Sequence, residues 1–148
     1  MYSLEEFDKA KTKILRYILY KKRTENEVRT KFKNDIDEEM LEDAIEYLKE
    51  AKYIDDEDYI EKTINNFKIL KKMSIMELKY KLQAKGLNKD LIEDYIYQNK
   101  DELIEYEINS AEKIILRKDQ EKQETVSYLM KKGYKRDNIN KAFERIEN

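Results

Sequence analysis

The stretch SIMELKYKLQAKGLNKDLIEDYI, residues 74–96, decides the fold, because EKQETVSYLMKKGYKRDNINKAF, residues 121–143, can be laid over it without a gap. A third copy, TENEVRTKFKNDIDEEMLEDAI, residues 24–45, fits after a one-residue deletion where the other two have glycine. The equivalent positions are apolar or turn residues: Leu82 with Leu129, Gly86 with Gly133, Leu87 with Tyr134 and Ile92 with Ile139. Three copies at intervals of roughly fifty residues indicate a repeat protein.

The beginning of each copy predicts a helix start. Thr24 with Glu27, and Ser74 with Glu77, have the S/T-x-x-E spacing of a capping box. In that motif the hydroxyl accepts a hydrogen bond from a first-turn amide, and the glutamate accepts one from the amide of the capping residue.

The middle of each copy predicts a turn and a second helix. Gly86 and Gly133 fall where the first helix should stop and the chain needs a positive φ. Asp37 and Asn88 are placed to cap the next helix, whereas the third copy has Lys135 there, which is a weaker start.

A longer helical segment precedes each pair of short helices, so the sequence predicts nine helices. We expect an all-α fold: an extended array of three tandem three-helix repeats, with repeat 1 at residues 1–54, repeat 2 at 55–99 and repeat 3 at 100–148. The composition agrees, because 43% of the residues are charged, glycine occurs twice and proline is absent. Such a chain favours helices joined by short turns.

The composition also removes several kinds of chemistry. Cysteine and histidine are both absent, so thiolate nucleophiles and the commonest metal ligands are missing. No phosphate-binding glycine loop or HExxH motif occurs. We therefore expect no enzyme activity, no metal and no cofactor. We also expect no membrane span or signal peptide, and a cytoplasmic location.

The acidic run YIDDEDYIEK, residues 53–62, is the strongest candidate for an exception. A Ca²⁺ loop starting at Asp56 would need glycine at its sixth position and glutamate at its twelfth, but these are Glu61 and Phe67. No context supports a glycosidase-type carboxylate pair. We interpret the run as a helix start, with Asp55 or Asp56 as N-cap, and keep an acidic contact face as the alternative.

Charge alternates in blocks along the chain although the net charge is only −2. Residues 9–33, 66–90 and 113–141 are basic, and the segments between them are acidic. Stacked repeats would place the basic blocks in a row, which suits a phosphate backbone or an acidic groove. The candidate contact residues for such a phosphate backbone or acidic groove are Lys71, Lys72, Lys79, Lys81, Lys85, Lys131, Lys132, Lys135 and Arg136.

Several segments together resemble the RecX family of bacterial recombinase regulators. They are AIEYLKEAKYIDDEDYIEKTI, residues 44–64, followed by the stretch at 74–96, and YLMKKGYKRDNINKAF, residues 128–143. The resemblance covers nearly the whole chain and includes the three-by-three helix count. Tyr59-Ile60 stands where the family usually has Phe-Ala, and the first repeat lacks its turn glycine.

The resemblance implies a partner and a function. RecX proteins bind the RecA filament on single-stranded DNA, lie in its helical groove, and usually inhibit RecA's ATPase, strand-exchange and coprotease activities. We therefore expect a monomeric regulator with RecA as partner and weak non-specific contact with DNA.

Two other classes fit the residues. One is a sequence-independent nucleic-acid-binding helical module without a recombinase partner, for which Tyr80, Tyr97 and Tyr106 are the tyrosines to examine as base-stacking platforms. The other is a purely structural adaptor. Salt-dependent binding to bare DNA would distinguish the first from the recombinase regulator.

Overall fold

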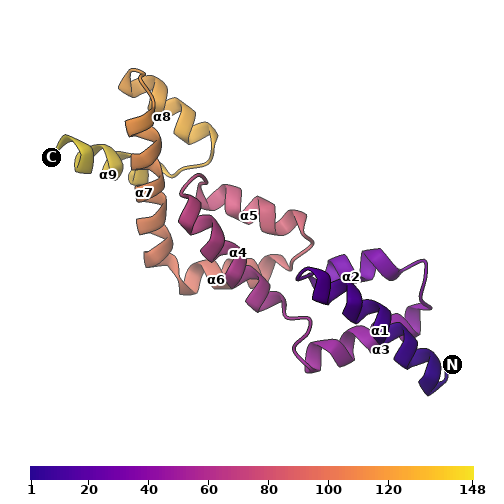
Figure 1. Ribbon diagram of the computed structural model, residues 1–148. Helices are drawn as coiled ribbons and strands as arrows, with labels where there is room; N and C mark the ends of the chain where they lie inside the picture. The colour runs from indigo at the N-terminus through magenta and orange to yellow at the C-terminus, as the bar shows by residue number, and fades with distance from the viewer.

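The computed structural model describes residues 1–148, and all of its regular structure is helical. Nine helices follow one another along an elongated molecule (Figure 1). They are α1 (Leu4–Tyr20), α2 (Glu25–Phe32), α3 (Glu38–Glu50), α4 (Asp56–Leu70), α5 (Ile75–Ala84), α6 (Lys89–Gln98), α7 (Lys100–Arg117), α8 (Lys122–Lys131) and α9 (Arg136–Glu147). The predicted all-α array of three-helix repeats is confirmed; we call α1–α3, α4–α6 and α7–α9 its first, second and third units.

Local capping explains where most of these helices begin. Both predicted capping boxes are present, at Thr24 with Glu27 and at Ser74 with Glu77. The Asn88 side chain accepts hydrogen bonds from the amides of the α6 first turn. Asp37 is the N-cap residue of α3, as predicted, but its side chain makes no capping hydrogen bond. The residues that precede α7, α8 and α9 make none either.

The acidic run at residues 53–62 begins α4, as the helix-start interpretation required. Asp55 is the N-cap, and its carboxylate accepts a hydrogen bond from the Asp58 amide at 3.1 Å. Glu57 and Asp58 lie in the first turn, where negative charge is favoured by the helix dipole.

The buried apolar residues form three separate hydrophobic clusters and not one large core. The first lies within α1–α3 and includes Ile14 and Leu48, and the third lies within α7–α9 and includes Leu129 and Ile139. The middle cluster joins α4, α5 and α6 but also takes Leu103 from α7. The unit boundaries after residues 54 and 99 stay a prediction.

The first two units have the same burial pattern where the first helix ends and the second begins. Residues 19–30 and 69–80 are buried, half-buried or exposed in the same order at every position. Val28 and Leu78 are both buried, as are Phe32 and Leu82. The sequence alignment therefore corresponds to equivalent places in the fold.

The same hydrogen bond links each unit to the next. The Thr24 hydroxyl donates to the backbone carbonyl of Lys85 at 3.0 Å, and the Ser74 hydroxyl donates to that of Lys132 at 2.7 Å. Both hydroxyls are fully buried. The cap of one short helix thus satisfies a free carbonyl at the end of its counterpart in the following unit.

The turn glycines bring the units close enough for this bond. Gly86 and Gly133 have φ angles of 78° and 97°, as predicted. A Cβ atom on Gly133 would lie 2.9 Å from the Cβ of Met76 and 3.2 Å from the Ser74 hydroxyl. Glycine is therefore needed at this turn both for its backbone conformation and for the approach of the preceding unit.

The junction between the second and third units has a buried polar network. Glu107 of α7 is fully buried, and one oxygen accepts from the Ile75 amide at 2.8 Å. Its other oxygen accepts from the Lys135 amide at 3.2 Å and from the Asn138 side chain at 2.5 Å. The carboxylate thereby ties α5 to the start of α9 through α7.

A smaller version of this arrangement occurs at the first junction. There the Asp56 carboxylate accepts from the Glu25 amide at 3.0 Å, and Glu25 follows the cap Thr24 as Ile75 follows Ser74. Burial raises the pKa of Asp56 above its ordinary value.

No helix of the protein has the length and apolar character needed to cross a bilayer.

Candidate functional site

The first group of predicted contact residues surrounds α5. Lys71 and Lys72 lie in the connection before this helix, Lys79 and Lys81 lie within it, and Lys85 is its C-cap. Lys71 has a left-handed backbone conformation with a φ of 51° and accepts a hydrogen bond from Ser110 through its carbonyl, which fixes this turn against α7.

The second group lies at the equivalent turn of the third unit. Lys131 ends α8, Lys132 is its C-cap, Lys135 is the residue before α9, and Arg136 is the first residue of α9. The Arg136 guanidinium contacts the sulfur of Met130 at 3.7 Å. Of these residues, Lys85 and Lys132 occupy matching places, since each is the C-cap of the second helix of its unit.

Two of the nine residues are committed to internal ion pairs. Lys79 pairs with Glu93 of α6 at 2.8 Å, and this hydrogen bond holds the pKa of the Glu93 carboxyl below its ordinary value. Lys132 lies 3.6 Å from Glu77 of the preceding unit. These two lysines stabilise the array itself and offer less charge to a partner.

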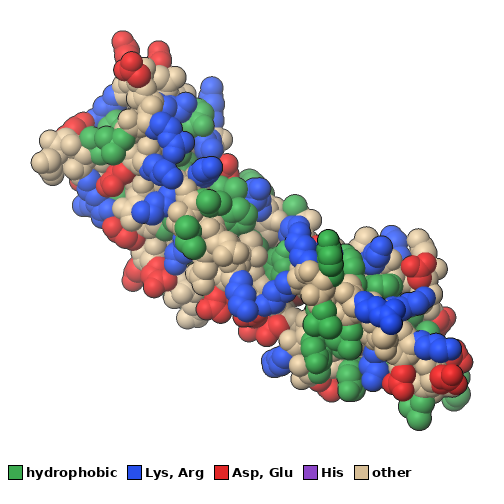
Figure 2. Space-filling view, in the orientation of Figure 1, with side chains coloured by type: hydrophobic (Ala, Val, Ile, Leu, Met, Phe, Trp, Pro, Cys, Tyr) green, Lys and Arg blue, Asp and Glu red, His purple; other side chains and the backbone are tan.

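The other seven residues form no ion pair within 4 Å and are exposed. They are Lys71, Lys72, Lys81, Lys85, Lys131, Lys135 and Arg136. We call these seven the free basic set. Figure 2 shows lysine and arginine side chains distributed over the length of the visible face, with apolar side chains between them.

The tyrosines divide into exposed and buried ones. Tyr80 and Tyr97 are exposed, at 63% and 66% of their surface. Tyr106 is buried and donates a hydrogen bond to the Met73 carbonyl at 2.6 Å, and burial raises its pKa. Of the three, only Tyr80 and Tyr97 present a ring to a partner.

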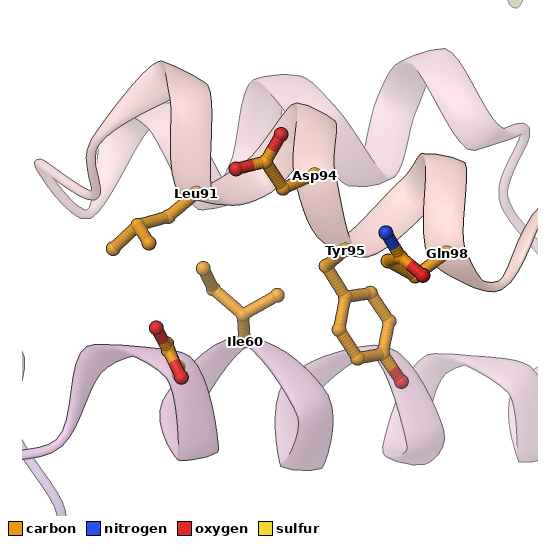
Figure 3. A pocket seen from close by; sticks show the side chains of 6 residues that line it. Ile60, Leu91, Asp94, Tyr95 and Gln98 are labelled. Atoms are coloured by element: carbon orange, nitrogen blue, oxygen red, sulfur yellow. The ribbon is translucent and has the colours of Figure 1, made fainter.

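A half-open hollow of about 230 Å³ lies between α4 and α6 (Figure 3). Ile60, Leu91 and Tyr95 form its apolar part, and Glu57 and Asp94 are the carboxylates of its lining. Its volume is below the ~300–1,000 Å³ of ordinary small-molecule sites. No group of three or more acidic residues in the protein is arranged to hold a metal ion.

No protein-family model matches the chain. Among curated proteins, it is 31% identical to the regulatory protein RecX of Clostridium perfringens strain SM101, over 97% of this chain and 71% of that protein. It is also 31% identical to the regulatory protein RecX of Staphylococcus epidermidis, over 99% of this chain and 58% of that protein.

The chain belongs to the RecX family.

Solved RecX structures have the same fold. The crystal structure of RecX from Lactobacillus salivarius superposes with a TM-score of 0.81, covering 98% of this chain and 99% of that one at 24% sequence identity. A second RecX crystal structure gives a TM-score of 0.79 at 23% identity, over 94% of this chain and 73% of that one. The chain spans a little over half the length of the Staphylococcus epidermidis RecX, so its relatives differ considerably in length.

Sequence reasoning located the basic blocks but not the residues that fix their positions. Glu107 lies in the segment LIEYEIN, within an acidic block, and a charged helical residue is ordinarily expected to be exposed. Only its place opposite the cap of α5 explains its burial. The sequence did not predict the ion pairs of Lys79 and Lys132 either, because their acidic partners lie on other helices.

Proposed function

We propose that this protein is a regulator that binds the RecA filament on single-stranded DNA. In this proposal it acts as a monomer in the bacterial cytoplasm, has no catalytic activity of its own, and inhibits the ATPase, strand-exchange and coprotease activities of RecA. Its membership in a family whose members are named regulatory proteins is the observation that carries the proposal.

The shape of the molecule supports a filamentous partner. Three units of similar structure follow one another along an elongated body, and each successive pair is joined by the same hydroxyl-to-carbonyl bond (Figure 1). Weak contacts distributed over such a rigid body add through effective concentration, provided that the partner repeats at a matching interval.

The charge distribution favours a filament over bare DNA. With a net charge of −2, the protein has no overall basic field to concentrate it on nucleic acid. The free basic set supplies local positive charge at the second and third units. We assign these seven residues to contacts with acidic protein surface or with the DNA held inside the filament.

A binding assay on fluorescently labelled single-stranded DNA, with and without assembled RecA, tests the proposal. We expect clearly tighter binding to the RecA-coated strand. Equal or tighter binding to bare DNA, weakening steeply with salt, would contradict it and favour the sequence-independent nucleic-acid-binding module.

A further inference from the structure

The first helix of every unit ends in the same pattern, two apolar residues followed by two basic ones. The three ends read Leu-Tyr-Lys-Lys at residues 19–22, Ile-Leu-Lys-Lys at 69–72 and Ile-Leu-Arg-Lys at 115–118. The third is shifted by one residue, so that Leu19, Ile69 and Leu116 each lie two residues before a lysine C-cap. We call these segments the three helix-end patches. Figure 1 shows that the C-terminal ends of α1, α4 and α7 follow one another along the array.

Each patch exposes a large aliphatic side chain to a similar degree. Leu19 is 72% exposed, Ile69 is 77% exposed and Leu116 is 72% exposed. A single exposed apolar residue needs no explanation. Three exposed apolar residues at matching helix ends do need an explanation, because none of them belongs to the hydrophobic clusters of the three units.

The cations of the patches are mostly unpaired. Lys21, Lys71, Lys72 and Arg117 form no ion pair within 4 Å, whereas Lys22 pairs with Asp58 and Lys118 lies over the Tyr128 ring at 3.8 Å. Basic residues at a helix C-terminus favour the helix dipole. That effect accounts for the lysines and arginine but leaves the neighbouring aliphatic side chains unexplained.

We propose that the three helix-end patches are the docking surface for a protein polymer, each of whose subunits offers an apolar hollow beside a carboxylate. Charge complementarity requires an acidic partner for the free cations. The repetition of the patch requires a partner that repeats. The inference rests on the proposed function, and it identifies the part of this protein that would contact the RecA filament.

The side-chain chemistry favours protein over single-stranded nucleic acid as the occupant. Leu19, Ile69, Leu70 and Leu116 are aliphatic, and Tyr20 is the one exposed aromatic residue in the three patches. Sequence-independent binding of single strands relies on aromatic rings against which bases stack. Aliphatic side chains instead fill hollows on protein surfaces.

The test uses serine substitutions at the exposed aliphatic positions: Leu19→Ser, Ile69→Ser and Leu116→Ser, singly and together. The matched control is Leu4→Ser, since Leu4 is 83% exposed in α1 but lies outside the patches. The probe is a RecA filament assembled on oligothymidine with a slowly hydrolysed ATP analogue. Circular dichroism verifies that every variant stays helical.

We expect each single substitution to weaken filament binding about 3- to 10-fold and the triple substitution about 100-fold or more, because linked contacts multiply. Leu4→Ser should bind within about twofold of the wild type, since it lies outside the patches. A second variant, Lys71→Glu with Lys72→Glu, should also bind less tightly and does not depend on the serine variants folding.

The outcomes separate the two proposals. If the wild type binds the filament and the triple variant binds equally well, the proposal that the helix-end patches are the docking surface is wrong, and the proposed function stands. If the wild type does not bind the filament, both are overturned. If the triple substitution instead abolishes self-association of this protein in sedimentation velocity, the patches join copies of this chain, and the inference is again wrong.

Discussion

The Ser74 hydroxyl donates to the Lys132 carbonyl at 2.7 Å while its oxygen also accepts from the Glu77 amide at 3.1 Å. One buried side chain thus caps a helix of the second unit and joins it to the third. Thr24 has the same two roles toward Glu27 and Lys85. Glu121, at the matching place in the third unit, is exposed and makes no capping hydrogen bond.

Removal of the Ser74 hydroxyl should cost far more than removal of its exposed counterpart. Ser74→Ala loses a cap and leaves the half-buried Lys132 carbonyl without its donor, and we expect a loss of about 2–3 kcal/mol in the free energy of unfolding. Glu121→Ala is the matched control and should change it by less than about 0.5 kcal/mol. Urea denaturation followed by circular dichroism measures both. Similar losses for the two variants would mean that the link between units contributes little.

Glu107 should be indispensable to the second junction. Glu107→Gln keeps the size of the side chain but turns an amide NH₂ toward backbone or side-chain N–H donors, and we expect a loss of about 2–4 kcal/mol. Hydrogen exchange should show faster exchange at the Ile75 and Lys135 amides, which donate to this carboxylate. Glu112→Gln, at a half-buried position on the same helix, is the control. Unchanged protection at both amides would contradict this role for Glu107.

Acid should weaken the fold through carboxylates held by arginine. Hydrogen bonds from Arg29 lower the pKa of Glu42, and those from Arg145 lower the pKa of Glu105. A carboxyl whose pKa is lowered in the folded state stabilises the fold at pH values above its pKa in the unfolded chain, about 4.3 for glutamate. That stabilisation is lost as the pH falls through the pKa of the folded state. Thermal unfolding should therefore occur at lower temperature as pH falls from about 5 to 3.

Two substitutions check the sign of this pH dependence. Arg29→Gln should flatten it, because Glu42 then regains an ordinary pKa. Asp56→Asn should steepen it, because burial raises the pKa of Asp56 and its protonation favours the folded state as pH falls. A pH profile that neither substitution alters would contradict the assignment of acid sensitivity to these groups.

Charge reversal should separate the free basic set from the paired lysines. Lys81→Glu with Lys85→Glu should weaken binding to the RecA filament about tenfold, since neither lysine has an acidic partner within the protein. The control exchanges the Lys79 and Glu93 charges by Lys79→Glu with Glu93→Lys, which keeps the net charge and the pair. An equal loss from the exchanged pair would mean that the position of Lys79, and not free charge, governs binding.

Local signals in the sequence were enough to predict the units themselves. The capping boxes at Thr24 and Ser74 and the positive φ of Gly86 and Gly133 depend on residues within one turn of each other, and all four were predicted correctly. The links between units depend on residues about 60 positions apart, such as Thr24 with Lys85. The sequence shows why a hydroxyl is there but not that it has a second partner.

The same distinction applies to the candidate binding surface. Sequence blocks indicated which lysines and arginines cluster, and the structure shows that Lys79 and Lys132 are paired with acids. The exposure of Leu19, Ile69 and Leu116 had a readable signal, the apolar-apolar-basic-basic pattern at three helix ends. A helical apolar residue is ordinarily assigned to the core, so only the structure shows that these three are exposed.

The most direct measurement of the central claim is the ATPase rate of RecA on single-stranded DNA while this protein is titrated in below one molecule per RecA. A regulator that engages several filament subunits at once should lower the rate at ratios well below one. An unchanged rate up to equimolar protein, with binding to bare DNA detected separately, would contradict RecA regulation and leave the family resemblance as one of fold alone.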